Sequence, residues 1–83
     1  MGTMRIRTPK VVITFATTAD AMAIEAAAKE HDDVPGRMIP VPSAIDAGCG
    51  FAWRCEPDQE PALFDAMARY GLAYEGRFEV PMY

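Results

Sequence analysis

The sequence has few of the side chains that hold metals or build disulfide frameworks. It contains two cysteines, Cys49 and Cys55, one histidine, His31, and no Cys-x-x-Cys motif. Two cysteines do not make a disulfide framework, and one histidine cannot complete a zinc site with them. His31 has no evident partner for acid–base chemistry, which disfavours an ordinary enzyme. We therefore expect neither a metal nor a cofactor, and a carrier or binding protein rather than a stand-alone enzyme.

Positive charge and long apolar runs are also scarce. Eight lysines and arginines stand against twelve aspartates and glutamates, which gives a net charge of −4. Without a basic stripe, nothing displaces the counterions of a nucleic acid, and we expect no such partner. The apolar runs fall far short of the roughly 20 residues of a membrane helix, and no signal-peptide pattern is visible. We expect no membrane association and a cytoplasmic location, where thiols stay reduced.

The pattern that is present consists of two similar halves within 83 residues, the length of one domain. Residues 1–8 form an N-terminal segment that we expect to fray, and residues 9–83 form the domain. Runs of β-branched and aromatic residues predict strands, while caps and apolar stripes predict helices. The expected strands are 11–15, 37–41, 51–55 and 74–80, and the expected helices are 17–30 and 58–70, capped by Thr17 or Thr18 and by Asp58.

The order β-α-β-β-α-β predicts an α+β protein of the ferredoxin-like kind. Two helices then cover one face of a four-stranded antiparallel sheet, and right-handed crossovers place the first and third strands in its centre. Alternation puts Cys55 on the face of Trp53, so we expect Cys55 to be a buried core thiol. The expected helix-facing core comprises Val11, Ile13, Phe15, Ile39, Val41, Phe51, Trp53, Phe78 and Val80, closed by Met22, Ala23, Ala26 and Ala27 of the first helix and Leu63, Phe64, Met67 and Ala68 of the second.

Cys49 stands between two glycines, Gly48 and Gly50, just before the apolar strand at 51–55. Structural cysteines are usually buried among large side chains, whereas glycine neighbours leave a sulfur poorly shielded. This pattern is typical of a presented thiol, and backbone N–H groups turned toward the sulfur would favour the thiolate. Arg54 would lower the thiol pKa further if its side chain folds back. The alternative is that Cys49 is only a small residue in a tight turn.

Several segments together resemble one family of small bacterial proteins. They are the strand start VVITF, the helix opening T-x-x-A, the strand RMIPVP, the segment SAIDAGCGFAWR and the ending G-x-F-E-V. Over residues 11–80 the chain resembles the selenium/sulfur carrier-like family, whose most specific mark is a Cys-Gly pair before a short apolar strand ending in Arg. The resemblance implies sulfur or selenium handling at Cys49. On the physical grounds given above, Gly48, Gly50 and Arg54 would support this thiol, and a carrier would need donor and acceptor proteins as partners. It implies nothing for Cys55.

Three function classes remain open. The first is a carrier that holds sulfur or selenium on Cys49 as a persulfide-type adduct. The second is a non-catalytic regulatory or interaction module, and a small domain of this kind gains from covering its helix-free face. We expect a homodimer through that face, which includes Val12 and Ala52, or through the edge strand near Ile39. The third class, a metallochaperone, is weakest because copper chaperones of this fold carry Cys-x-x-Cys in the first loop, which here has no thiol.

Overall fold

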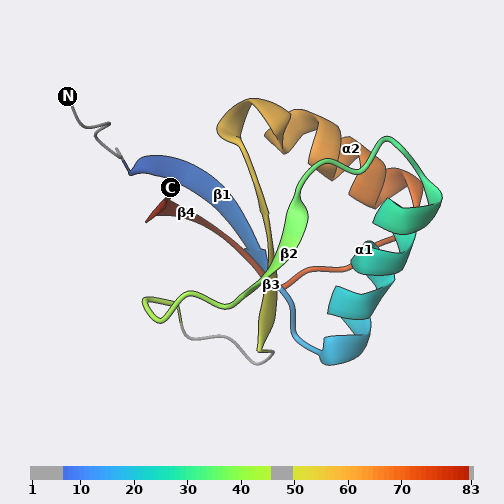
Figure 1. Cartoon of the computed structure of the whole chain (residues 1–83). Coiled ribbons are helices and arrows are strands. Elements are labelled where there is room, and N and C mark those ends of the chain that lie inside the picture. Colours follow the sequence, from blue (N-terminus) through green and yellow to red (C-terminus); the bar gives the residue numbers. More distant parts are fainter. Residues whose placement is uncertain (1–6, 46–49, 83) are drawn as a thin grey trace.

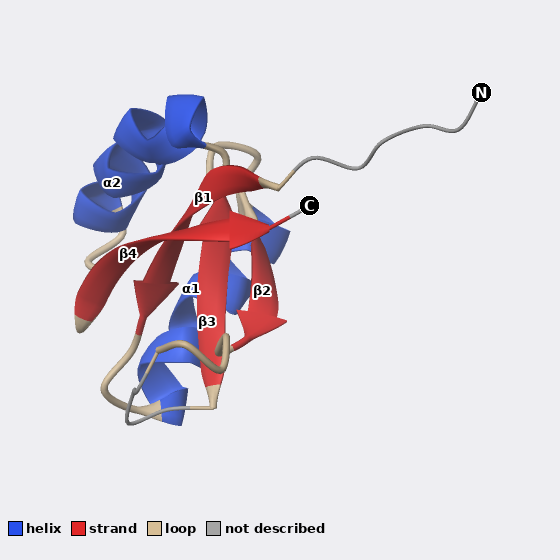
Figure 2. Ribbon diagram, turned by 90° about the vertical axis from the view of Figure 1, so that its left-hand side faces the viewer, coloured by secondary structure: helices blue, strands red, loops and turns tan. Residues whose placement is uncertain are grey.

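The computed structural model describes residues 7–45 and 50–82 of the chain. Its four strands form one antiparallel sheet in the order β2-β3-β1-β4, so the first and third strands are central, as predicted. Both helices cover one face of this sheet (Figures 1 and 2). The predicted α+β class, four-stranded antiparallel sheet and pair of helices are therefore confirmed. The elements are β1 (Thr8–Thr14), α1 (Thr18–Glu30), β2 (Arg37–Pro40), β3 (Phe51–Cys55), the short 3-10 helix η1 (Pro57–Gln59), α2 (Glu60–Arg69) and β4 (Gly76–Met82).

The two helices begin in different ways. The side chain of Thr17 accepts a hydrogen bond from the backbone N–H of Asp20 at 3.2 Å, which confirms the predicted cap of α1. The predicted cap of the second helix, Asp58, is wrong because this residue lies inside η1. There the side chain of Gln59 accepts from the backbone N–H of Glu56 at 2.9 Å, and α2 follows directly with a proline in its first turn.

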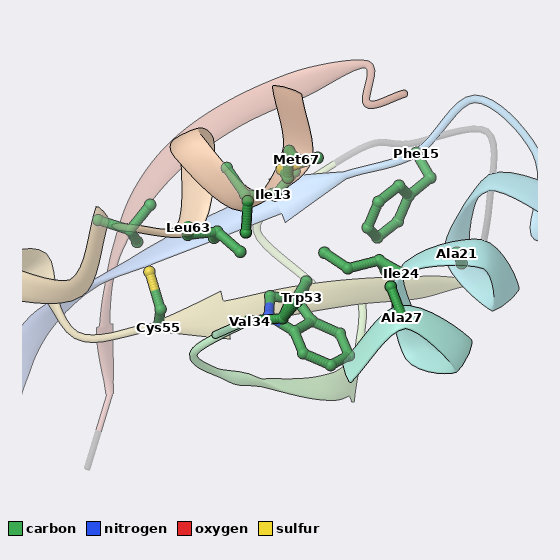
Figure 3. Packing of buried hydrophobic residues seen from close by; sticks show 12 residues of the cluster. Ile13, Phe15, Ala21, Ile24, Ala27, Val34, Trp53, Cys55, Leu63 and Met67 are labelled. Atoms are coloured by element: carbon green, nitrogen blue, oxygen red, sulfur yellow. The ribbon is translucent and has the colours of Figure 1, made fainter. Parts of the chain in front are cut away.

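The core lies between the helices and the face of the sheet that carries Val11 and Ile13 (Figure 3). Four of the nine predicted sheet residues are fully or almost fully buried there, and Cys55 is buried beside Trp53 as expected. The indole N–H of Trp53 donates to the carbonyl of Pro35 at 2.8 Å, so the one polar atom of this ring is satisfied. The buried cluster comprises Val11, Ile13, Phe15, Ala21, Ile24, Ala27, Val34, Trp53, Cys55, Leu63, Ala66 and Met67.

The prediction that Phe78 and Val80 face the helices is wrong. In the β1–β4 register Phe78 lies opposite Val12, while Arg77 lies opposite Ile13. Since Ile13 belongs to the core, β4 presents Arg77 to the helix side and Phe78 to the helix-free side. The guanidinium of Arg77 is neutralised there by Glu60 of α2, with Nε–Oε2 and Nη2–Oε1 distances of 2.7 and 2.8 Å. A charged side chain can face the helices at Arg77 because β4 is an edge strand and Glu60 of α2 lies close enough to pair with it.

Three further predicted core residues are only partly buried. Ile39 lies opposite Ala52, on the helix-free face, and is half-buried. Phe51 is the first residue of β3 and keeps 43% of its surface exposed. Val41 is half-buried just past the end of β2, which is Pro40 rather than the expected residue 41.

The buried stripes of the helices differ from those expected. In α1 only Ala27 of the predicted stripe is buried, whereas Met22 is 51% exposed. An alanine-rich helix offers several equivalent stripes, and the branched side chain of Ile24 sets the one that packs on the sheet. In α2 the prediction is right for Leu63 and Met67, while Phe64 is partly buried. The remaining differences are that Ala23, Ala26 and Ala68 are exposed and that Ala21 and Ala66 are buried instead.

The loop between α1 and β2 is fastened to the end of α2 by Asp33. Its carboxylate accepts hydrogen bonds from the Tyr70 hydroxyl at 2.8 and 2.9 Å and from the Arg69 guanidinium. The hydrogen bond from Tyr70 is the main cause that holds the pKa of Asp33 below its usual value. His31, the C-cap of α1, stacks on the Tyr70 ring with centroids 4.1 Å apart. The two helix ends are thus joined on the protein surface.

We expect Gly36→Ala to destabilise the protein by at least about 2 kcal/mol. Gly36 has a φ of +102°, and a Cβ atom there would lie 2.5 Å from Nε1 of Trp53 and even closer to the carbonyl oxygen of Arg54. Gly71→Ala is the matched control, because Gly71 also has a positive φ of 65° but a Cβ there meets nothing within 4 Å. Urea unfolding of the two variants measures the difference, and equal losses of stability would contradict the steric explanation.

Candidate functional site

The loop between β2 and β3 carries the predicted thiol, and its two described ends are anchored to each other. The N–H of Val41 donates to the carbonyl of Gly50 at 3.1 Å, which extends the pairing of the two strands by one step. The N–H of Ile45 donates to the carbonyl of Pro42 at 2.9 Å and closes a turn. Cys49 and Gly48 lie outside the described residues, so their roles remain predictions.

Gly50, the residue that follows Cys49 in the chain, is exposed. A Cβ atom at this position would meet no atom of residues 7–45 or 52–82 within 4 Å. Within the described ranges the glycines with positive φ are Gly36 and Gly71, so Gly50 is not held in the left-handed conformation. Toward the described part of the chain, the backbone is therefore open on the Cα side of Gly50.

The stem of this loop lies over the helix-free side of the sheet (Figure 1). A cavity of about 440 Å³ separates it from the end of β4. Its lining residues come from the start of β1, the loop and the last residues of β4, namely Arg7, Pro42, Ser43, Ala44, Val80, Pro81 and Met82. The face opposite the helices is therefore partly covered by the chain itself.

Arg54 lies at the other end of β3 from the predicted thiol. Its side chain is 14% exposed, and its Nη2 lies 3.4 Å from Oε2 of Glu56. At about 3.3 Å per residue of strand, its Cα lies roughly 13 Å from that of Gly50. The contacts of Arg54 thus tie it to Glu56, and its support of a thiolate at Cys49 stays a prediction.

Lys10 and Glu56 complete a charged cluster that the sequence analysis missed. The Nζ atom of Lys10 lies 2.7 Å from Oε1 of Glu56, and both residues stand one position beyond the paired residues Val11 and Cys55. The hydrogen bond from Lys10 is the main reason that the pKa of Glu56 is lowered, so this side chain is a carboxylate at neutral pH. The sequence contained a signal for this cluster. Lys10 precedes Val11 of one central strand and Glu56 follows Cys55 of the other, so antiparallel pairing of the two strands makes them neighbours.

The second cysteine is a core residue. The Cys55 residue is 2% exposed, and its sulfur points into the interior (Figure 3). Burial raises the pKa of the Cys55 thiol to about 11, and the carboxylates of Glu60 and Glu56 act in the same direction. Since the thiolate is the reactive form of cysteine, Cys55 is inert at neutral pH.

Residues 7–45 and 50–82 include neither a metal-binding cluster nor a membrane-spanning helix. In this part of the chain no three His, Cys, Asp or Glu side chains converge to hold a metal ion. None of the helices described is both long enough and apolar enough to span a bilayer.

The comparisons with known proteins give one result. The family described as "Putative Se/S carrier protein-like" matches residues 10–79, from β1 into β4. Because the match covers most of the chain, the protein belongs to this family, and the resemblance found in the sequence is confirmed. Neither a curated protein nor a solved structure matches the chain.

We expect Cys55 to resist iodoacetamide in the native protein. With a pKa of about 11, the thiolate fraction at about pH 8 is on the order of one thousandth, and the sulfur is also shielded. The Cys49→Ser variant isolates this thiol, and mass spectrometry follows its alkylation. Complete labelling in denaturant is the control, and rapid labelling of the folded variant would show that Cys55 is accessible.

Proposed function

We propose that the protein carries sulfur or selenium on Cys49 as a persulfide-type adduct and delivers it to an acceptor protein. Membership of the selenium/sulfur carrier-like family supports this function. The observation that carries the assignment to Cys49 is the burial of Cys55, whose raised pKa and 2% exposure remove it from consideration. The chain has two cysteines, so one candidate is left.

Transfer through a single thiol consists of two exchange steps. The thiolate of Cys49 attacks the outer sulfur of a donor persulfide, a sulfur–sulfur bond forms on Cys49, and the donor leaves as a thiolate. An acceptor nucleophile then attacks the same outer sulfur and releases the Cys49 thiolate. Electrons balance at each step, so neither needs an oxidant or a reductant.

A carrier of this kind requires that no second thiol resolves the adduct. A neighbouring thiolate would attack the inner sulfur of the persulfide, form a disulfide and release sulfide. Cys55 cannot act as such a resolving thiolate because it is buried and protonated at neutral pH. The inertness of Cys55 thus favours a stable adduct on the other cysteine.

The residues around Cys49 have separate roles in the proposal. Gly48 and Gly50 leave access for the donor and the acceptor, and the open space around Cα of Gly50 supports this for one side. Arg54 would stabilise the thiolate only after its guanidinium leaves Glu56, which lies 3.4 Å away. We therefore assign access to the glycines as the main contribution and treat Arg54 as secondary.

We also propose that the protein has a ferredoxin-like fold and a cytoplasmic location. The strand order β2-β3-β1-β4, with the element order β1-α1-β2-β3-η1-α2-β4, supports the fold. A reducing compartment suits a protein whose two cysteines serve as one free nucleophile and one core residue.

Incubation with a cysteine desulfurase and cysteine should add about 32 Da to the protein, the mass of one sulfur atom on a thiolate. We expect peptide mapping to place the adduct on Cys49 and a thiol acceptor to remove it. Cys49→Ser should abolish the adduct, and Cys55→Ala should retain it. An adduct of equal yield in both variants would refute the carrier proposal, as would an adduct that no acceptor removes.

The second candidate function is a protein-interaction module, for which the helix-free face gives one observation. Val12 and Ala52 of this face are fully buried already, but the Phe78 residue is 40% exposed beside half-buried Val80. Phe78 and Val80 form a small apolar area on a face that also carries Lys10 and Arg54, and aromatic residues are enriched in protein interfaces. We propose that a second copy of the chain covers Phe78, whether or not Cys49 carries sulfur.

Sedimentation velocity tests the homodimer. We expect Phe78→Gln to lower the fraction of dimer with little change in thermal stability, since the ring is substantially exposed. Met22→Gln is the control, because Met22 is 51% exposed on α1, on the opposite side of the sheet. A monomeric parent protein at high concentration would contradict the homodimer.

A further inference from the structure

A small cavity lies where β3 extends past the start of β2. The first residue of β2, Arg37, is paired with Arg54, so Cys55 and Glu56 continue beyond the neighbouring strand. The resulting space has a volume of about 210 Å³. We call it the Arg37–Arg54 notch, and its lining residues are Gly36, Arg37, Arg54, Cys55, Glu56 and Gln59.

The notch brings together charges of the same sign. Arg37 and Arg54 are direct cross-strand partners, and two like charges in that position destabilise a sheet. The side chain of Arg54 is 14% exposed, so water screens its charge poorly. Lys10 adds a third cation through its contact with Glu56, and the one carboxylate that lines the notch is shared by Lys10 and Arg54.

Within residues 7–45 and 50–82, the two other acidic groups that act on Cys55, Glu60 and Asp58, form no ion pair with Arg37 or Arg54. Glu60 acts on Cys55 from a distance, but its carboxylate is bound by Arg77 at 2.7 Å. Asp58 also acts on Cys55 and is exposed on η1. Among the described residues, the notch is therefore lined by two cations, Arg37 and Arg54, and by one carboxylate, Glu56, which is bound by Lys10 as well as by Arg54.

Arg37 is exposed and differs from the described cations that have an acidic partner. Lys29, Arg69 and Arg77 each lie within 4.0 Å of an acidic partner. Across residues 7–45 and 50–82, no carboxylate lies within ion-pair distance of Arg37. A guanidinium in this position is available to an anion that enters the notch.

The size and the donors of the notch define the ligand. Arginine offers a planar fork of N–H donors that matches the oxygens of phosphate, sulfate and carboxylate groups. A volume of about 210 Å³ is below the roughly 300 Å³ at which pockets for drug-sized ligands begin. We propose that the Arg37–Arg54 notch binds a small oxyanion, with one phosphate- or sulfate-sized group held between the two guanidinium groups. This site does not depend on the proposed carrier function.

Amide NMR spectra during titration with sodium phosphate or sodium sulfate test the site, against sodium chloride at equal ionic strength. We expect saturable shifts confined to the notch, at Gly36, Arg37, Cys55, Glu56 and Gln59, with at least one of the two oxyanions. Arg37→Gln should weaken binding about tenfold or more, since one charge-assisted contact is worth that factor.

Three controls make the result decisive. Lys29→Gln removes an exposed cation of α1, whose ion-pair partner is Glu25 of the same helix, and should leave the affinity unchanged. Cys49→Ser should also bind normally, which separates this site from the carrier chemistry. Arg54→Gln should also weaken binding, provided that its amide spectrum shows a folded protein. If this variant does not fold, the Arg37→Gln variant still tests the site, because Arg37 is exposed. Absence of saturable shifts with both oxyanions, equal shifts with chloride, or unchanged affinity in Arg37→Gln would overturn the proposal.

Discussion

The register between the two central strands is the constraint on which the rest of the structure depends. Val11 lies opposite Cys55 and Ile13 opposite Trp53, so these four side chains share the face that the helices cover. A shift of one residue would turn all of them to the other face. The packing of both helices and the chemical state of Cys55 follow from this one pairing.

The same register sorts the charges and the thiols. It sets Lys10 beside Glu56 and turns Arg54 to the helix-free face, over which residues 41–45 after β2 also lie. It also makes the two cysteines unequal, because Cys55 loses its reactivity by entering the core. The carrier proposal rests on this difference in reactivity between Cys49 and Cys55. The Arg37–Arg54 notch arises from the stagger of β2 against β3, at the end of β3 opposite Gly50.

Much of the fold was predictable because its signals are local or periodic. Thr17 caps α1 through a bond three residues away, and the alternation of β3 was enough to bury Cys55. The side to which β4 turns Phe78 was not predictable, because alternation does not say which set faces the helices. In the structure the helix-facing set includes Arg77, which pairs with Glu60, a residue 17 positions away in sequence. The pairing of Arg37 with Arg54 was likewise not predictable, because it depends on the register between β2 and β3. Cys49 was predicted from its glycine neighbours and from the family resemblance.

The hydrogen bond from Trp53 to Pro35 has a spectroscopic consequence. Trp53 is the sole tryptophan of the chain, it is 3% exposed, and its indole N–H is bound to the loop that precedes Gly36. Its emission therefore depends on whether this loop is docked against β3. Trp53 is thus an intrinsic fluorophore beside the start of β2. It allows local opening of the loop between α1 and β2 to be followed in real time without an attached label.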